Sequence, residues 1–320
     1  MDTLYSDFAY DDAYRTMESE CDDLLIPFVN YFHNENYGSD AKINRGRNEH
    51  FIEKEGHSEQ KRITDSAFEI VDKGRRRMYH YECESSRYDD SLLIRMFEYD
   101  TQIALDSGNI SRHCLHIDIP YSGILVLRGF GDFDKVYVEL TTPGGSVRYP
   151  VAIRRMSELD IDSIFDKHLY MLLPFYIFNM ENKLDVINKD FEKLEVLADE
   201  YIDIIKRLDE VVEKGYLSSF SHGVIIRMIH KVVYKLAINR ENVQKRVGDI
   251  MGGRVLELDI IKAHREGKSE GRTEGRTEGR NEGRNEERAN NIRKLAENYM
   301  SKDATLTEEE AYEMARSVLE

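Results

Sequence analysis

Three acidic residues could hold a metal ion in this chain: Asp65, Glu82 and Glu84, in the spacing Asp-x16-Glu-x-Glu. Alternation of apolar and polar residues predicts two paired strands around them, over 64–71 and 77–85. Successive side chains of a strand point to opposite faces, so Glu82 and Glu84 share one face. Asp65 begins the preceding strand and can reach that face across the pair.

Convergent carboxylates repel one another unless a cation lies between them, and hard oxygen ligands suit Mg²⁺ or Mn²⁺. We therefore expect Asp65 and Glu82 to bind the ion, with the backbone carbonyl of Cys83 as a further ligand. His80 shares their face by alternation and could orient water or phosphate. Such a site is suited to phosphodiester hydrolysis. The alternative is that these are solvent-facing acids on a strand edge, which the spacing alone does not exclude.

The charge of the chain is uneven. Its net charge of −16 argues against a general nucleic-acid binder, yet residues 41–88 hold eleven basic against nine acidic residues. The sign of the local charge matters more than the total for contact with a phosphate backbone. We expect DNA contacts from four arginines of this segment: Arg62, Arg75, Arg76 and Arg77. A solvated hairpin tip at 73–77, following the turn Asp-Lys-Gly at 72–74, is the alternative.

The remaining periodicity indicates a mixed chain. It predicts helices over 9–33 and 90–107, and further strands over 48–52, 113–119, 123–128, 134–141 and 147–156. This mixture favours an α/β or α+β core that ends near residue 160. Helical patterns follow over 161–180, 183–213 and 217–265.

The C-terminal part contains a tetrapeptide repeat of Glu, Gly, a basic and a polar residue, over 266–286. On a helix its glutamates stack on glutamates and its arginines on arginines, while each glycine costs about 1 kcal/mol relative to alanine. The repeat is either a flexible tether or a self-associating stalk that needs a partner helix. Further on, Thr307-Glu-Glu-Glu310 has the spacing of a capping box and predicts the start of a final short helix.

Several function classes find no support in the sequence. No apolar run approaches 18 residues and no signal-peptide pattern is present, so we expect neither a membrane span nor secretion. The three scattered cysteines favour reduced thiols and a cytoplasmic protein. Tyrosine is abundant, with 19 residues, but the sequence does not arrange the tyrosines as a base-stacking platform.

A set of motifs resembles the PD-(D/E)XK nuclease family transposases, relatives of the recombination-promoting nucleases of bacteria. The motifs are Ile-Thr-Asp65-Ser, Tyr-His-Tyr-Glu82-Cys-Glu84-Ser-Ser, and Ile-Arg-Met-Phe-Glu-Tyr-Asp at 94–100, with weaker similarity at 11–16, 48–51 and 62–65 and in the repeat. The resemblance implies a restriction-endonuclease-like α/β core, with a mixed sheet flanked by helices, followed by an all-helical C-terminal region. It also implies Mg²⁺-dependent DNA cleavage and a link to DNA recombination or mobile elements. The corresponding parts are a nuclease core at 1–180, a helical region at 181–265, the repeat at 266–286 and a helical tail at 287–320.

The resemblance assigns roles by position. Asp65 matches the first acid of the motif and Glu82 the second, and Asp12 matches a helical acid that can add a metal contact. Glu84 stands where the family has lysine or, in this branch, glutamine. A carboxylate cannot donate the hydrogen bond that those residues offer to water or phosphate. Arg95, on the following helix, is the best candidate for the missing donor.

Two other hypotheses remain open at this stage. Glu84 and the acidic composition also fit a catalytically inactive DNA- or protein-binding relic whose helical tail forms an oligomer. A purely structural oligomerisation protein would explain the repeat, but would leave the arrangement of Asp65 and Glu82 unexplained.

Overall fold

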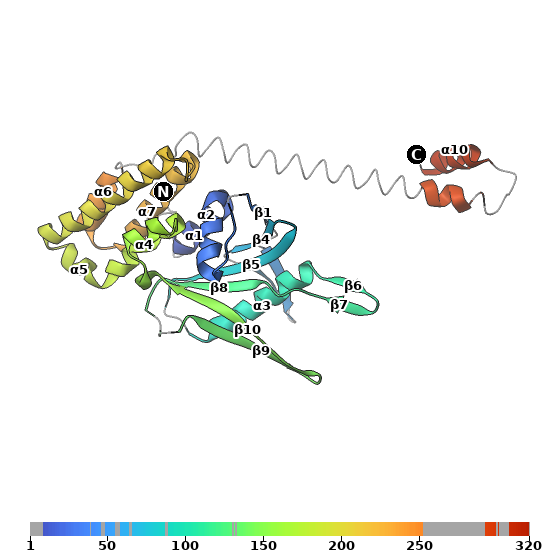
Figure 1. Ribbon diagram of the computed structural model, residues 1–320, viewed down its shortest axis with the longest axis horizontal. Coiled ribbons are helices and arrows are strands. Elements are labelled where there is room, and N and C mark those ends of the chain that lie inside the picture. The colour runs from blue at the N-terminus through green and yellow to red at the C-terminus, as the bar shows by residue number, and fades with distance from the viewer. Residues whose placement is uncertain are drawn as a thin grey trace. The chain divides into compact units, whose positions relative to one another are not determined.

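The structure, a computed structural model, describes residues 9–38, 40–45, 49–54, 58–63, 66–86, 89–129, 131, 133–251, 292–298, 300 and 307–319 (Figure 1). Side chains of 49–54 and 58–63 lie outside the description. The chain divides into two units, one before and one after Leu256. Asp65 and the whole 266–286 repeat fall outside the described residues, so the tether and stalk alternatives remain open.

A six-stranded mixed sheet forms the centre of the first unit. Its order is β1 (Lys42–Arg45), β4 (Ser66–Asp72), β5 (Arg75–Glu84), β8 (Tyr121–Val126), β10 (Gly145–Arg155) and β9 (Lys135–Thr142). The neighbours β5, β8 and β10 run parallel, and the other pairs are antiparallel. The predicted mixed α/β core is thus confirmed. Two separate hairpins, β2–β3 and β6–β7, comprise Glu49–Lys54 with Ser58–Ile63 and Asn109–Ser111 with Cys114–His116.

The turn between β4 and β5 matches its sequence prediction. Asp72 pairs with Arg75, which leaves Lys73 and Gly74 as a two-residue loop. Both have positive φ, 49° and 79°, as a type I′ hairpin requires. This turn fixes the register that puts Ser66, the first residue of β4, opposite Tyr81.

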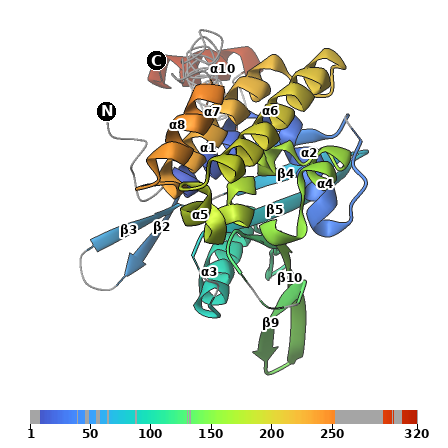
Figure 2. The same cartoon turned by 90° about the vertical axis from the view of Figure 1, so that its left-hand side faces the viewer.

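Helices cover both faces of the sheet (Figure 2). On one face, α3 (Ser91–Asp106) packs Leu92 and Met96 against an apolar cluster of β8 and β10. On the other face, Phe28 and Phe32 of α2 (Asp22–His33) contact the ring of Tyr81, with centroids 5.1 and 5.0 Å apart.

The predicted helix over 9–33 is two helices, α1 (Ala9–Glu20) and α2. Cys21 separates them, with φ of −124° and ψ of 81° outside the helical region. Asp22 and Asp23 follow in the first turn of α2, where acidic side chains interact favourably with the helix dipole. The periodicity of the apolar residues continues through Cys21, so the sequence pattern did not reveal the break between the two helices.

The chain after the sheet is helical, as expected. It forms η1 (Met156–Glu158), α4 (Ile161–Asp166), η2 (Tyr170–Lys183), α5 (Leu184–Ile187), α6 (Phe191–Glu213), α7 (Ser219–Leu236) and α8 (Glu241–Ile250). The segment η2 is a 3₁₀ helix, and its Pro174 has no amide hydrogen to donate. Helix α7 packs on α1 and η2, so these helices belong to the same unit as the sheet. No helix in the described part of the chain is long and apolar enough to cross a bilayer.

The second unit contains a helical segment at 292–298 and α10 (Glu308–Leu319). Ala296, Ala311 and Ala315 are buried between them. The predicted helix start at Thr307 is confirmed, since α10 begins at the next residue.

Candidate active site

The strand β5 places the predicted acids at one end of the sheet. His80, Glu82 and Glu84 lie on the face covered by α3, and they alternate with Tyr79, Tyr81 and Cys83 on the face covered by α2. Glu84 ends the strand beside Val126, the last residue of the parallel strand β8. Open α/β sheets usually bind ligands at the carboxyl ends of their parallel strands. The position is therefore suited to a functional site.

Helix α3 brings a cation between the two glutamates. The Nη2 atom of Arg95 lies 3.5 Å from Oε2 of Glu82 and 3.3 Å from Oε2 of Glu84. Glu82 is almost fully buried, whereas the side chain of Arg95 is 44% exposed. The guanidinium thus stands at the solvent side of the carboxylates, where a substrate would approach them.

Glu84 is held by its own local turn as well as by Arg95. Its Oε1 accepts hydrogen bonds from the amide of Ser86 at 2.8 Å and from the hydroxyl of Ser86 at 2.5 Å. In these contacts, as in that with Arg95, the carboxylate of Glu84 is the acceptor. The charged donor among its partners is Arg95.

His80 connects Glu82 to the protein interior. Its Nδ1 lies 2.7 Å from Oδ1 of Asp100, and its Nε2 lies 3.4 Å from Oε1 of Glu82. Because each ring nitrogen faces a carboxylate oxygen, both nitrogens must carry hydrogen to satisfy both contacts. Burial alone would lower the pKa of His80, but the hydrogen bonds and charges of Asp100 and Glu82 outweigh it and raise the pKa to about 9. The ring is fully buried, so it holds Glu82 and does not reach solvent.

Asp100 is itself fixed by two hydroxyl groups that the sequence did not single out. Ser122 of β8 donates to its Oδ1 at 2.6 Å, and Tyr149 of β10 donates to its Oδ2 at 3.3 Å. Ser122 is the strand partner of His80, which puts their side chains on the same face. We call Ser122, Tyr149, Asp100 and His80 the buried relay. A sequence signal for it exists, because Asp100 falls on the apolar stripe of α3, four residues after Met96.

The helical acid near the glutamates is Asp11, and Asp12 points elsewhere. Asp12 is exposed and pairs with Lys231 of α7. Asp11 is half-buried, and its pKa is raised by burial, with Glu82 and Glu84 adding to the rise and Arg15 opposing it. Two adjacent acids lie about 100° apart around a helix, so only its rotation decides which one faces the sheet.

The four arginines predicted to contact DNA are not equivalent. Arg76 pairs with Glu69 at 2.8 Å, and Arg77 pairs with Glu35 and lies 5.0 Å from the ring of Tyr121. Arg75 is exposed, and the side chain of Arg62 lies outside the description. Arg75 begins β5, nine residues before Glu84, which corresponds to about 30 Å along a strand. The structure does not bring Arg75, Arg76 or Arg77 next to the glutamates.

The metal ligands predicted from the sequence are only partly within the described residues. Glu82 and Glu84 supply two carboxylates that converge on the guanidinium of Arg95. Carboxylate oxygens are also the kind of ligand that Mg²⁺ prefers. The side chain of Cys83 is buried on the opposite face, so only its backbone could take part. Among the described residues, no group of three or more His, Cys, Asp or Glu side chains could hold a metal ion. Asp65 is outside that set.

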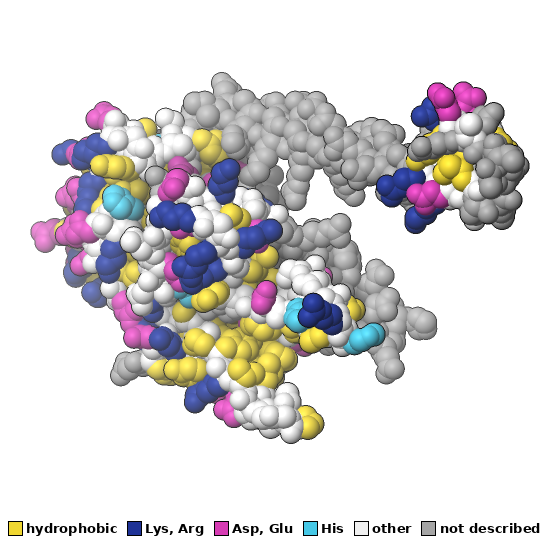
Figure 3. Space-filling view, turned by 45° about the vertical axis from the view of Figure 1, so that its right-hand side comes forward, with side chains coloured by type: hydrophobic (Ala, Val, Ile, Leu, Met, Phe, Trp, Pro, Cys, Tyr) yellow, Lys and Arg dark blue, Asp and Glu magenta, His cyan; other side chains and the backbone are white. Residues whose placement is uncertain are grey.

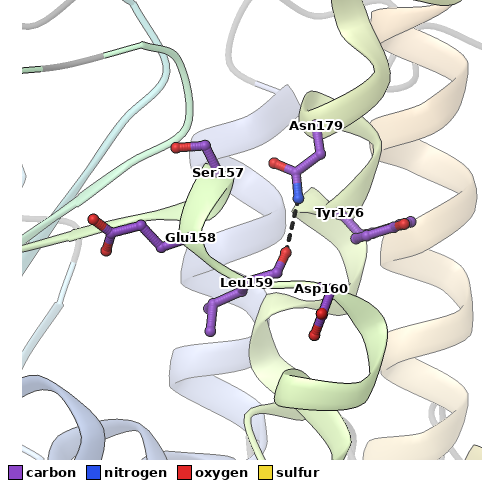
Figure 4. A pocket seen from close by; sticks show the side chains of 6 residues that line it. All are labelled: Ser157, Glu158, Leu159, Asp160, Tyr176 and Asn179. Atoms are coloured by element: carbon purple, nitrogen blue, oxygen red, sulfur yellow. Dashed lines mark hydrogen bonds between the residues drawn. The ribbon is translucent and has the colours of Figure 1, made fainter.

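A separate cavity of about 350 Å³ lies where η1 meets η2 (Figure 4). Its polar groups serve the local fold. Asn179 donates to the carbonyl of Leu159 at 2.9 Å, and Asp160 caps α4 by accepting from the amide of Ser163. Tyr176 donates to Glu200 at 3.4 Å. These contacts give the cavity a structural role.

Comparisons with known proteins provide no relative: no family model, no curated protein and no solved structure matches the chain.

Proposed function

We propose that this protein is a metal-dependent DNA endonuclease of the PD-(D/E)XK type. The main support is that Glu82 and Glu84 converge on the guanidinium of Arg95 at the carboxyl end of a parallel strand. The buried relay supports it further, because four polar groups in the core are arranged to orient one carboxylate. A link to recombination or mobile elements, as in the transposases that the chain resembles, is part of the same proposal.

Asp65 and Glu82 would hold Mg²⁺ or Mn²⁺, with Asp11 close enough to influence the charge of the site. Ser66, the chain neighbour of Asp65, pairs with Tyr81 next to Glu82. When bound, the metal supplies an activated water and stabilises charge on the scissile phosphate. Asp11 takes the role that the resemblance gave to Asp12.

The protein residues have separate tasks in this proposal. His80 donates to Oε1 of Glu82 and leaves its second oxygen directed toward Arg95 and the open side. Arg95 donates hydrogen bonds to the scissile phosphate, in place of the lysine or glutamine that Glu84 has replaced. Arg75 would contact the DNA backbone farther along the duplex, and the C-terminal helices would mediate contact with a second copy.

A plasmid-nicking assay tests the proposal, with Mg²⁺, Mn²⁺ and EDTA reactions. The Glu82→Ala and Asp65→Ala variants should each lose at least about 100-fold in nicking rate, because each removes a metal ligand. Glu139→Ala, an acid on the edge strand β9 away from the site, is the matched control and should cut normally. Undiminished cleavage by Glu82→Ala would contradict the assignment.

The contact of Arg95 with both glutamates also favours a second candidate, a catalytically inactive DNA-binding protein. A guanidinium that neutralises both carboxylates does part of what a metal ion would do. In this case the wild-type protein should bind DNA in EDTA, should not cut with any metal, and should not be stabilised by Mn²⁺. Glu84→Lys and Glu84→Gln, which restore a donor, are then the variants in which cleavage should appear.

A further inference from the structure

A second cavity in the described part of the molecule lies away from the glutamates. It has a volume of about 1000 Å³ and lies between α2, β1, the residues between α4 and η2, and the loop before α7. His80, Arg95 and Ser86, which contact Glu82 or Glu84, do not line it. Its size falls in the range of cavities that bind small organic ligands. We call it the tyrosine cavity.

Four tyrosines from separate elements line this cavity: Tyr31, Tyr37, Tyr170 and Tyr216. Tyr216 is 65% exposed, and its ring centroid lies 5.7 Å from that of His168. Tyr170 lies with its hydroxyl 2.7 Å from Nδ1 of the same histidine. Tyr31 and Tyr37 are half-buried and Tyr170 is buried, so Tyr216 is the ring that is open to solvent. An open aromatic face is suited to stacking with a flat ligand. The tyrosines are far apart in the sequence, so only the fold assembles them.

The backbone at His168 is also unusual for its residue type. Its φ is 56°, in the left-handed region where glycine is usual after a helix. A histidine there costs free energy relative to glycine, and in return it places an imidazole against Tyr170 and Tyr216. The ring of His168 thus helps to position Tyr170 and Tyr216 at the cavity.

Two acids and two lysines line the tyrosine cavity, and both acids are held by contacts within the protein. Of its two acids, Asp22 pairs with Arg45, and Asp23 accepts from the amide of Ser218 and the hydroxyl of Ser221. The cavity also has two exposed lysines, Lys42 and Lys167. The ammonium of Lys167 lies 5.3 Å from the ring of Tyr31.

Neither lysine forms an ion pair with any residue in the described ranges, so both ammonium groups can meet an incoming anion. A ligand with a flat aromatic group joined to an anionic group could contact both the tyrosines and the lysines of the cavity. We propose that the tyrosine cavity binds a nucleotide, with the base against the tyrosines and the phosphate beside Lys42 and Lys167. The nucleotide is either free or part of a single strand, and both share this chemistry. The site lies apart from the glutamates and does not depend on cleavage.

Binding is measured by fluorescence anisotropy with the full chain in EDTA, where metal-dependent cutting cannot occur. The probe is a fluorescein-labelled thymidine octanucleotide, with thymidine monophosphate as an unlabelled competitor. Tyr216→Ala and Lys167→Glu should each weaken binding of the octanucleotide about tenfold, through lost stacking and reversed charge. Both residues are exposed, so neither change should alter the unfolding temperature.

Matched controls come from the edge strand β9. Tyr137→Ala, at 45% exposure, and Lys135→Glu should bind the probe as the wild-type protein does. Competition by the monophosphate would identify a free nucleotide as a sufficient ligand, and its failure would identify a single strand. No binding by the wild-type protein would overturn the proposal, as would binding by both cavity variants with the affinity of the wild type. Nicking activity would remain a separate question in either case.

Discussion

A histidine lies against each face of β5, half-buried His33 of α2 on one and fully buried His80 of β5 on the other, and their pKa values are shifted in opposite directions. On the α2 face, His33 packs against the rings of Tyr79, Tyr81 and Tyr121, with centroids 5.4, 5.7 and 5.9 Å away. Burial lowers its pKa to about 4, and the charges of Arg154 and Arg77 contribute. On the α3 face, His80 lies between two carboxylates and its pKa is about 9.

The comparison shows that the partners of a buried imidazole decide its charge. Both rings lose solvation, which disfavours the charged form. The charges of Arg154 and Arg77 oppose a proton on His33, whereas Asp100 and Glu82 each accept a hydrogen bond from one ring nitrogen of His80. One strand thereby separates a neutral aromatic core from a polar relay, by alternation alone. Three changes test this contrast.

The largest effect should come from Asp100→Asn, which removes the carboxylate that raises the pKa of His80 most. Loss of one partner from a buried charged pair should cost about 3 to 5 kcal/mol in the free energy of unfolding near pH 7. In the wild-type protein the raised pKa of His80 adds stability that is complete below about pH 6.5 and is lost as pH rises through 9. That alkaline loss should shift to lower pH in the variant. Urea unfolding in EDTA measures both effects.

Asp106→Asn, at the last residue of α3, is the matched control and should stay within about 0.5 kcal/mol of the wild type. If the stability of the Asp100→Asn variant fell at the same alkaline pH as that of the wild type, Asp100 would not determine the charge of His80.

A smaller effect is expected on the aromatic face from His33→Phe. The depressed pKa of His33 means that its contribution to stability is complete above about pH 6.5 and is lost as pH falls toward 4. Phenylalanine keeps the ring packing but cannot be protonated. The variant should therefore keep about 2 to 3 kcal/mol more of its neutral-pH stability at pH 4 than the wild type does. Urea unfolding followed by circular dichroism at pH 7 and pH 4 measures the difference. An equal loss of stability at pH 4 in both proteins would show that His33 does not cause the acid sensitivity.

The smallest effect should come from Gly123→Ala on β8. Gly123 pairs with Tyr81, and an added Cβ would lie 2.7 Å from the ring of Phe32 and 2.9 Å from that of Tyr81. Overpacking of this kind should cost about 1 to 2 kcal/mol. Gly144→Ala is the control, because its Cβ would meet only the Thr142 hydroxyl, at 3.7 Å. Comparable unfolding midpoints for the two variants would show that the aromatic face is more loosely packed than these distances indicate.

Much of the fold could be predicted from the sequence, because its signals are local. The turn at Lys73 and Gly74 and the start of α10 after Thr307 follow from residue types within a few positions. The break at Cys21 could not be seen, because apolar periodicity continues across it. The 3₁₀ geometry of η2 depends on packing around Pro174, which the pattern of apolar residues does not encode.

For the site, strand alternation correctly placed His80, Glu82 and Glu84 on one face. The groups that fix them come from α3, β8 and β10, and only tertiary packing brings those elements together. The rotation of α1, which selects Asp11 over Asp12, depends in the same way on contact with α7. The tyrosine cavity is the extreme case, since each tyrosine comes from a different segment and the sequence suggested no platform.

The contacts between α7 and the N-terminal helices have a consequence for synthesis of the chain. Asp23 accepts a hydrogen bond from the amide of Ser218, the N-cap of α7, across 195 residues, and Asp12 pairs with Lys231 across 219 residues. At ribosomal speeds of 5–20 residues per second, roughly 10 to 45 s pass between the emergence of α1 and that of its partner helix. During that interval the surface of α1 that α7 later covers is open to chaperones and to other nascent chains. We therefore expect the N-terminal helices to reach their final packing only after α7, which ends at Leu236, has been synthesised.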